Sequence, residues 1–445
     1  MDEYIGRLLE AARGAGIAAA EVYLASSDRF RAMCQHGVIS NYTVNSTRGL
    51  SLRGLWEGRM GYAATEAFDE ESIGQLIAGV KESASLSEDD SVQEIYPGDE
   101  TYPAVDNYAP ALDEVTPEEK LDYIREAEKA LLAADPRMVA ASYNMITTQS
   151  AAIRIVNTYG LDLRMRDNAI VSFIKGLAKE NGRSAGENAM SVGRVFRREE
   201  ALRTAKEAAE KTLYMLNAAP MASGVYRAIF DHDAMSDLLN VFAGIFSSEN
   251  AQQNMSLLAG REGERIASDA VTLTDDPLLE GGFESRGFDD EGVACRTLNV
   301  VENGVLKTLL YNLKTARKAG RASTGSARKA SYAAPVRVAP SNFFFKPGDK
   351  DLDALMADMG DGLVITWFGG LHAGANPLSG DFSLIAEGYT VRGGRKDQPV
   401  EQITVAGNFY ELLKSIRAVG SDLTFPGSGI GSPSVDVGEI RVSGK

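Results

Sequence analysis

Apolar residues recur at helical spacing between Ile5 and Ala12, and glycines follow at positions 14 and 16. A first helix is therefore predicted to end near residue 14. The pattern of the following residues predicts strands over 20–27 and 30–43, a hairpin over 49–65 and a helix over 69–86. The hairpin is expected to turn at Glu57-Gly58. Together these elements indicate an α+β unit with a mainly antiparallel sheet.

A second unit repeats this character. Thr116, Pro117 and Glu119 carry the residue types of a capping box with proline at the first helical position, so a helix is predicted from there to about residue 135. Strand patterns follow over 139–195, and a long helix is predicted over 198–219.

The segment between the two units, 88–114, has a different composition. It holds nine acidic residues and no basic one, and tyrosines recur every six positions at 96, 102 and 108 with prolines close behind. This is typical of an extended linker that crosses the surface. We expect the tyrosines to hold it against a neighbouring part of the chain.

From about residue 221 the chain is rich in glycine, proline and short alternating runs. A hairpin is predicted to turn at Asn303-Gly304, a pair that readily adopts positive φ, and one helix is predicted over 233–247. The fold class is therefore predicted as α+β. We expect an N-terminal domain over 1–220, including the acidic linker 88–114, and a β-rich domain of barrel or sandwich type over 221–445.

Charge narrows the range of functions. The 445 residues carry a net charge of −16, which argues against direct binding to nucleic acid or to an anionic membrane. The apolar runs are too short to span a bilayer, and the opening residues read as an amphipathic helix instead of a leader. The two cysteines, Cys34 and Cys295, lie far apart and suit a reducing compartment. Cytoplasmic localisation is the resulting expectation.

The sequence contains no clear set of metal ligands or catalytic nucleophile. The three histidines are His36, His232 and His372, and no two have helical ligand spacing. The run Asp231-His232-Asp233 is the best local cluster, but Asp231 is also placed to cap the following helix. No G-x-S-x-G elbow is present. We therefore assign no catalytic residue and no metal ligand.

One basic segment stands out within this acidic chain. Residues 304–348 hold nine Lys or Arg and no acidic residue. Two interpretations remain open, which are a solvated basic face and a site for a peptide carboxylate or acidic side chains. For the second, the candidate substrate-binding residues are Arg321, Arg328 and Lys329. The small residues of "ASTGSA" between the two arginines leave room for a peptide backbone.

Several short motifs occur in an order that resembles the TldD/PmbA family, on its PmbA (TldE) side, which is also labelled a modulator of DNA gyrase. They are "TDDP", "FDDEG", "ENGVLKTLLYN", "STGSARK", "SGDFSL", "PVEQITVAGNFYELLKSI" and "GSPSVDV". The resemblance covers most of the chain and is densest from residue 275 onwards. It implies a cytoplasmic, dimeric peptidase assembly that degrades or trims peptides. It also implies that a TldD-type partner holds zinc through an H-E-x-x-x-H helix and a later cysteine.

This chain departs from that metal pattern. The resemblance puts the metal helix at "LNVFAGIFSS", where the two ligand positions become Leu239 and Gly244 and the acid/base position becomes Asn240. After "AVGSDL", the expected cysteine is replaced by "TFPGSGIGSPS". Leucine and glycine offer zinc no side-chain lone pair, so we expect no cofactor in this chain and zinc in a TldD-type partner.

The last candidate substrate-binding segment is the one around His372. The resemblance puts "SGDFS" near a peptide cleft, and His372, Asn376 and Asp381 complete the candidate substrate-binding set. The leading hypothesis is a non-catalytic subunit, in a homodimer or in a heterodimer with a TldD-type chain, that binds peptides. The alternatives are an active peptidase with unorthodox metal ligands, such as His232 and His372, and a peptide-binding module without turnover.

Overall fold

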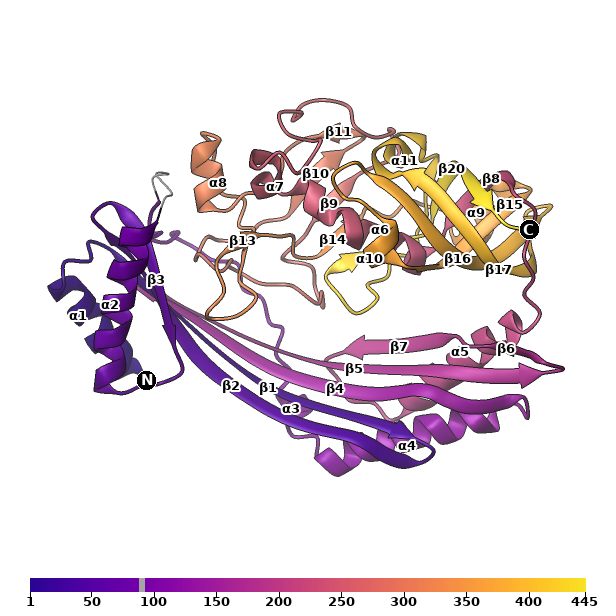
Figure 1. The fold of residues 1–445 in the computed structure, drawn as a ribbon, viewed down its shortest axis with the longest axis horizontal. Helices are drawn as coiled ribbons and strands as arrows, with labels where there is room; N and C mark the ends of the chain where they lie inside the picture. Colours follow the sequence, from indigo (N-terminus) through magenta and orange to yellow (C-terminus); the bar gives the residue numbers. More distant parts are fainter. Residues whose placement is uncertain (88–92) are drawn as a thin grey trace.

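One long antiparallel sheet forms the N-terminal half. The computed structural model describes residues 1–87 and 93–445. The sheet order is β3-β2-β1-β4-β5-β6, and β7 also pairs with β5. The strands are β1 Ala20–Gln35, β2 Val38–Trp56, β3 Arg59–Thr65, β4 Met138–Asn157, β5 Asp162–Glu180, β6 Arg183–Ala185 and β7 Asn188–Gly193. Figure 1 shows them as a curved band below the other half of the chain. The predicted turn is present, with Glu57 and Gly58 both at positive φ.

Two pairs of helices cover opposite ends of this sheet (Figure 1). They are α1 Asp2–Gly14 with α2 Glu70–Leu86, and α4 Pro117–Ala133 with α5 Glu199–Met215. The first pair packs Leu8 and Val80 against the β1 and β2 residues next to it, and the second packs Ile124 and Ala205 against β4 and β5. The capping box predicted at Thr116 is formed in both directions.

A closed barrel dominates the C-terminal half. Its sheet has the order β17-β16-β15-β8-β20-β18, and pairing of β17 with β20 closes five strands into a ring. The strands are β8 Gly224–Phe230, β15 Gly362–Gly369, β16 Asp381–Arg392, β17 Arg395–Asn408, β18 Ala418–Val419 and β20 Val435–Ser443. The expected mixed α+β class with a β-rich C-terminal half is confirmed.

A second, five-stranded sheet has the order β11-β10-β9-β14-β19. Its strands are β9 Leu273–Asp275, β10 Leu298–Glu302, β11 Val305–Leu306, β14 Phe343–Phe345 and β19 Ile430–Gly431, and β12 Ala327–Arg328 pairs separately with β13 Arg337–Val338. The β10–β11 turn has Asn303 and Gly304 at positive φ, as predicted. Its strands are shorter than the predicted hairpin, because the chain leaves the ladder after Leu306.

The remaining helices are short, apart from α6, which lies in the core shared by the barrel and this second sheet. They are α3 Pro110–Asp113, α6 His232–Phe242, α7 Ser248–Gln252, α8 Leu313–Lys318, α9 Leu352–Met359, α10 Leu371–Gly374 and α11 Phe409–Ser415, with a 3₁₀ turn Ala243–Phe246 after α6. Phe242 at the end of α6 stacks on Phe409, with ring centroids 4.5 Å apart. No helix in the described ranges is long and apolar enough to cross a membrane.

A buried ionic network joins the two halves. Arg53 on β2 donates to Glu21 on β1 at 2.7 Å and to Glu291 of the "FDDEG" motif at 3.0 Å. In the same motif, Asp290 accepts a hydrogen bond from the Tyr23 hydroxyl at 3.1 Å. Asp289 accepts from the backbone amides of residues 291, 293 and 327. The family motif therefore has a structural role at the contact between the halves.

The acidic linker is held against its neighbours, as its tyrosines suggested. Tyr102 donates to the carbonyl of Gly292 at 2.9 Å and packs edge-on against Phe288. Glu94 forms an ion pair with Arg317 of α8 at 3.1 Å. Residues 88–92, the first five of the predicted linker, lie outside the described residues.

Candidate functional site: a cleft beside strand β7

A cleft of about 1090 Å³ lies between the long sheet and the barrel. Its walls come from α5 and β7 on one side and from the start of α6, strands β15–β17 and residues 424–426 on the other. Every residue of β7 from Asn188 to Gly193 lines it. Among the described strands β7 pairs only with β5, so its outer edge is open to the cleft.

Acidic residues predominate in the lining of this cleft. Seven carboxylates and four Lys or Arg line it, in addition to His232. The carboxylates are Glu187, Glu200, Glu207, Glu210, Asp231, Asp233 and Asp237, and the cations are Arg197, Arg203, Lys211 and Lys396. Lys396 lies over the rings of Tyr214 and Tyr389, at 3.9 and 4.4 Å from their centroids.

The Asp231-His232-Asp233 run stands at the start of α6 and faces the cleft. Asp231 accepts a hydrogen bond from the amide of Ala234 at 2.9 Å, so its predicted N-cap role is confirmed. His232 Nδ1 lies 3.0 Å from Asp233 Oδ1. Burial opposes the charged imidazole, but the hydrogen bond to Asp233 and the charges of both aspartates outweigh it and raise the pKa of His232 to about 9.

Two carboxyl groups meet near the cleft wall from opposite halves of the molecule. Glu187, just before β7, hydrogen-bonds with Glu387 on β16. Burial raises the pKa of Glu187 to about 8, and the hydrogen bond and the charge of Glu387 add to the effect. Burial also raises the pKa of Asp231 to about 7. At neutral pH Glu187 is therefore protonated, and it can donate a hydrogen bond to Glu387.

The sequence pattern did not predict the contact between Glu187 and Glu387. Glu187 lies within the stretch 139–195, which reads only as strand. A Cβ on the preceding residue, Gly186, would come within 3.1 Å of the Gly176 carbonyl, so the backbone makes a close approach there. The signal that would find the pair is tertiary, since its two members are brought together by the packing of the barrel beside the sheet.

None of the six predicted substrate-binding residues lines this cleft, and the structure does not bring the six together. Arg321 pairs with Glu262 at 2.8 Å. Arg328 donates to the carbonyl of Ala327 at 2.8 Å, while its Nε and Nη2 atoms are buried without a partner in the described part of the chain. Several cations of the basic segment are thus paired within the described part of the chain, since Arg317 and Arg337 also form ion pairs, with Glu94 and Glu249.

Lys329 packs against strands β1 and β2 of the long sheet. Its ammonium donates to Ser51 Oγ at 2.8 Å and lies 4.4 Å from the ring centroid of Tyr23. Burial, together with the nearby Arg53 charge, lowers the pKa of Lys329 to about 8. This lysine is thus part of the contact between the halves.

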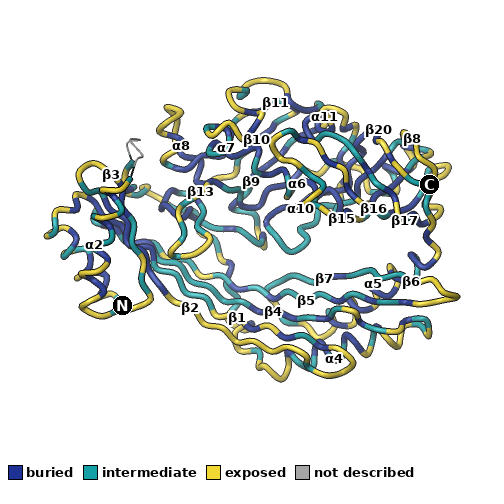
Figure 2. Tube along the Cα trace, in the orientation of Figure 1, coloured by how far each residue is buried: buried dark blue, intermediate teal, exposed yellow. Residues whose placement is uncertain are grey.

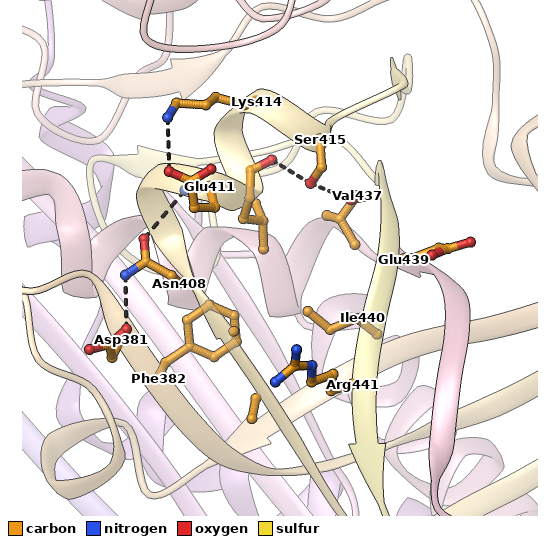
Figure 3. A pocket seen from close by; sticks show the side chains of 13 residues that line it. Asp381, Phe382, Asn408, Glu411, Lys414, Ser415, Val437, Glu439, Ile440 and Arg441 are labelled. Carbon is orange, nitrogen blue, oxygen red and sulfur yellow. Dashed lines mark hydrogen bonds and ion pairs between the residues drawn. The ribbon is translucent and has the colours of Figure 1, made fainter.

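The other three predicted residues lie at and after α10. His372 is exposed on α10, and Asn376 closes the following turn through its Oδ1, which accepts from the amide of Leu378 at 3.0 Å. Asp381 accepts from Asn408 Nδ2 at 2.9 Å. Figure 3 shows this pair at one end of a shallower groove of about 700 Å³ beside α11 and β20, on the barrel.

The two residues that the motif resemblance assigns to the family's metal positions, Leu239 and Gly244, offer no side-chain ligand to a zinc ion. Leu239 is fully buried in the C-terminal core, and a Cβ on Gly244 would lie 3.2 Å from Asn250 Nδ2. Within residues 1–87 and 93–445, no group of three or more His, Cys, Asp or Glu side chains is arranged to hold a metal. His372 lies outside the cleft that His232 lines.

Comparison with known proteins agrees with the resemblance in the motifs. The C-terminal domain model of the PmbA/TldA metallopeptidases matches residues 223–444, the central domain model matches 110–216, and the domain 1 model matches 20–84. Metalloprotease PmbA of Escherichia coli O157:H7 is 26% identical over 456 residues, which cover 100% of this chain and 96% of that protein. A metalloprotease TldD homolog of Haemophilus influenzae is 24% identical, with 96% and 92% covered.

Solved structures share the whole fold. A Thermotoga maritima structure described as a candidate modulator of a DNA gyrase superimposes with a TM-score of 0.92 at 29% identity, covering 99% of this chain and 100% of that one. TldE from Thermococcus kodakarensis has a TM-score of 0.89 at 21% identity, with 99% and 100% covered, which shows the shared fold. The domain models, the motifs and the fold agree, and this chain belongs to the TldD/PmbA family.

Proposed function

We propose that this chain is a zinc-less PmbA (TldE)-type subunit of a TldD/TldE metallopeptidase assembly that degrades or trims peptides in the cytoplasm. It supplies dimer contacts and part of the substrate chamber, and a TldD-type partner supplies the zinc. The proposal rests on the motif resemblance, which assigns the family's two metal-ligand positions to Leu239, a buried leucine, and to Gly244. Neither side chain can ligate zinc.

The cleft beside β7 supports the chamber role. A peptide in extended conformation can add to an open strand edge through main-chain hydrogen bonds, which is a binding mode that tolerates many sequences. The open edge of β7 lines the cleft over the whole length of the strand. The apposed barrel wall encloses the bound chain on the second side.

Reconstitution tests the proposal. The purified chain alone is expected to hold no stoichiometric zinc and to leave peptides intact, whereas a mixture with a zinc-bearing TldD-type chain cleaves them. Peptide turnover and elemental analysis are measured on each chain and on the mixture. About one tightly held zinc in this chain, or turnover by it alone, would instead support an active peptidase with unorthodox ligands such as His232.

The open β7 edge also favours a second candidate, a peptide-binding module without turnover. Calorimetric titration of the purified chain with an unstructured peptide separates the two. The module would be favoured by two results together. The isolated chain would bind the peptide, and the mixture would cleave peptides no faster than the TldD-type chain alone.

A further inference from the structure

The distal half of β2 is an open sheet edge. On one side β2 pairs with β1 over its full length, but on the other side β3 pairs only with Leu50–Trp56. Residues 38–48 are exposed except for the half-buried Ile39. Figure 2 shows this part of β2 as a yellow stretch at the outer rim of the sheet. No described strand covers that edge.

The composition of this edge lacks the usual protection against strand pairing. Natural sheets block open edges with charged residues, proline or bulges. The run "VISNYTVNST" over 38–47 contains no charged residue and no proline, although 24% of the whole chain is charged. Its bulge lies at the far end, between Met33 and Cys34 of β1.

An apolar stripe continues from the core to this edge. Phe30 and Ala32 on β1 belong to the core beneath α4, and their partners on β2 are Val44 and Tyr42. These two side chains are 65% and 49% exposed, and the Tyr42 ring packs edge-on against Phe30. The core therefore ends in uncovered apolar side chains.

We propose that a second copy of this chain covers the edge, pairing antiparallel with β2 about a twofold axis at Thr43. Thr43 is the midpoint of the exposed stretch 38–48, so this register uses the whole edge in both copies. It sets Tyr42 of each copy opposite Val44 of the other, an aromatic to β-branched pair on both sides of the axis.

The charges agree with self-pairing. In this register the one cation of the stretch, Arg48, lies opposite Val38, and the two copies of Arg48 are at opposite ends of the paired strands. No like charges therefore meet across the axis, although the whole chain carries a net charge of −16. The inference goes beyond the proposed function, because it concerns pairing between two copies of this chain and rests on the β2 edge and not on peptidase activity.

Two double variants test the register. Tyr42→Lys with Val44→Lys puts like charges opposite each other twice, whereas Tyr42→Lys with Val44→Glu puts opposite charges together at the same two places. Light scattering at micromolar concentration should show a dimer for the wild type and for the Lys/Glu variant. The dimer dissociation constant of the Lys/Lys variant should rise about tenfold or more. Circular dichroism and thermal unfolding check that all three chains fold alike.

Cross-linking gives a direct readout of the axis. A Thr43→Cys variant should form an intermolecular disulfide under mild oxidation, because residue 43 faces itself in this register. Cys34 and Cys295 are buried and serve as the internal control. A monomeric wild type, equal dissociation constants for the two double variants, or the absence of a cross-link would each overturn the proposal. None of these results bears on peptide turnover by the mixture, which tests the proposed function separately.

Discussion

Glu187 shows how burial can change the state of a single residue. Its contact with Glu387 places two carboxyl groups together, and its folded-state pKa of about 8 lies above the ordinary 4.5. The folded protein therefore binds this proton more strongly than the unfolded chain does. The corresponding stability is complete below about pH 4.5 and is lost as the pH rises through about 8.

Glu187→Gln is expected to remove this pH dependence, because the amide resembles the protonated acid at every pH. In urea unfolding, the variant should lose less stability than the wild type between about pH 4.5 and 8, by on the order of 1–3 kcal/mol. Glu199→Gln, at an exposed position on α5, is the matched control. Parallel pH profiles for the wild type and Glu187→Gln would contradict the raised pKa of Glu187.

At the scale of elements, α6 depends on the residue that precedes it. Asp231 accepts the amide of Ala234, and the same helix start presents His232 and Asp233 to the cleft. Local sequence was enough to predict this cap, because an N-cap depends only on neighbouring positions. The open edge of β7 could not be predicted in this way, because whether a strand lies at the edge of a sheet depends on which other strands pair with it in the folded protein.

Asp231→Ala and Asp231→Asn separate capping from charge. Alanine cannot accept the Ala234 amide, so the alanine variant should be less stable by about 0.5–2 kcal/mol. Asparagine keeps the acceptor and removes a buried charge, so its stability at neutral pH should match or exceed that of the wild type. Thermal unfolding of the two variants measures the difference. An alanine variant as stable as the asparagine variant would rule out the capping role.

At the scale of the whole molecule, the network around Arg53 holds the halves together. All three side chains are buried: Arg53 is 5% exposed, Glu21 is 1% exposed and Glu291 is 5% exposed. Breaking a buried pair by removing one partner leaves an uncompensated charge, which costs about 3–5 kcal/mol.

Arg53→Leu should therefore lower the free energy of unfolding by about 3–5 kcal/mol. Arg29→Leu, an exposed arginine on β1 of the same sheet, is the control and should change stability by less than about 1 kcal/mol. Denaturant unfolding of both variants gives the comparison. Equal losses in the two variants would show that the network does not stabilise the contact between the halves.

The sequence by itself determined the features that depend on neighbouring residues. The capping box at Thr116, the turn at Asn303-Gly304 and the cap at Asp231 are present as predicted, and the ordered motifs were sufficient to recognise the family. The resemblance also assigned leucine and glycine to the family's metal-ligand positions, and neither side chain can ligate zinc in any fold.

Only the tertiary structure decided where the charges find their partners. The basic segment reads as an unpaired patch, yet Arg317 meets Glu94 and Arg321 meets Glu262. Arg53 reaches Glu291 across 238 positions of sequence. The six predicted binding residues were grouped by composition and motif, but they lie in different parts of the fold. Charge pairing depends on distance in space, and sequence periodicity reports only which face of a helix or strand is buried.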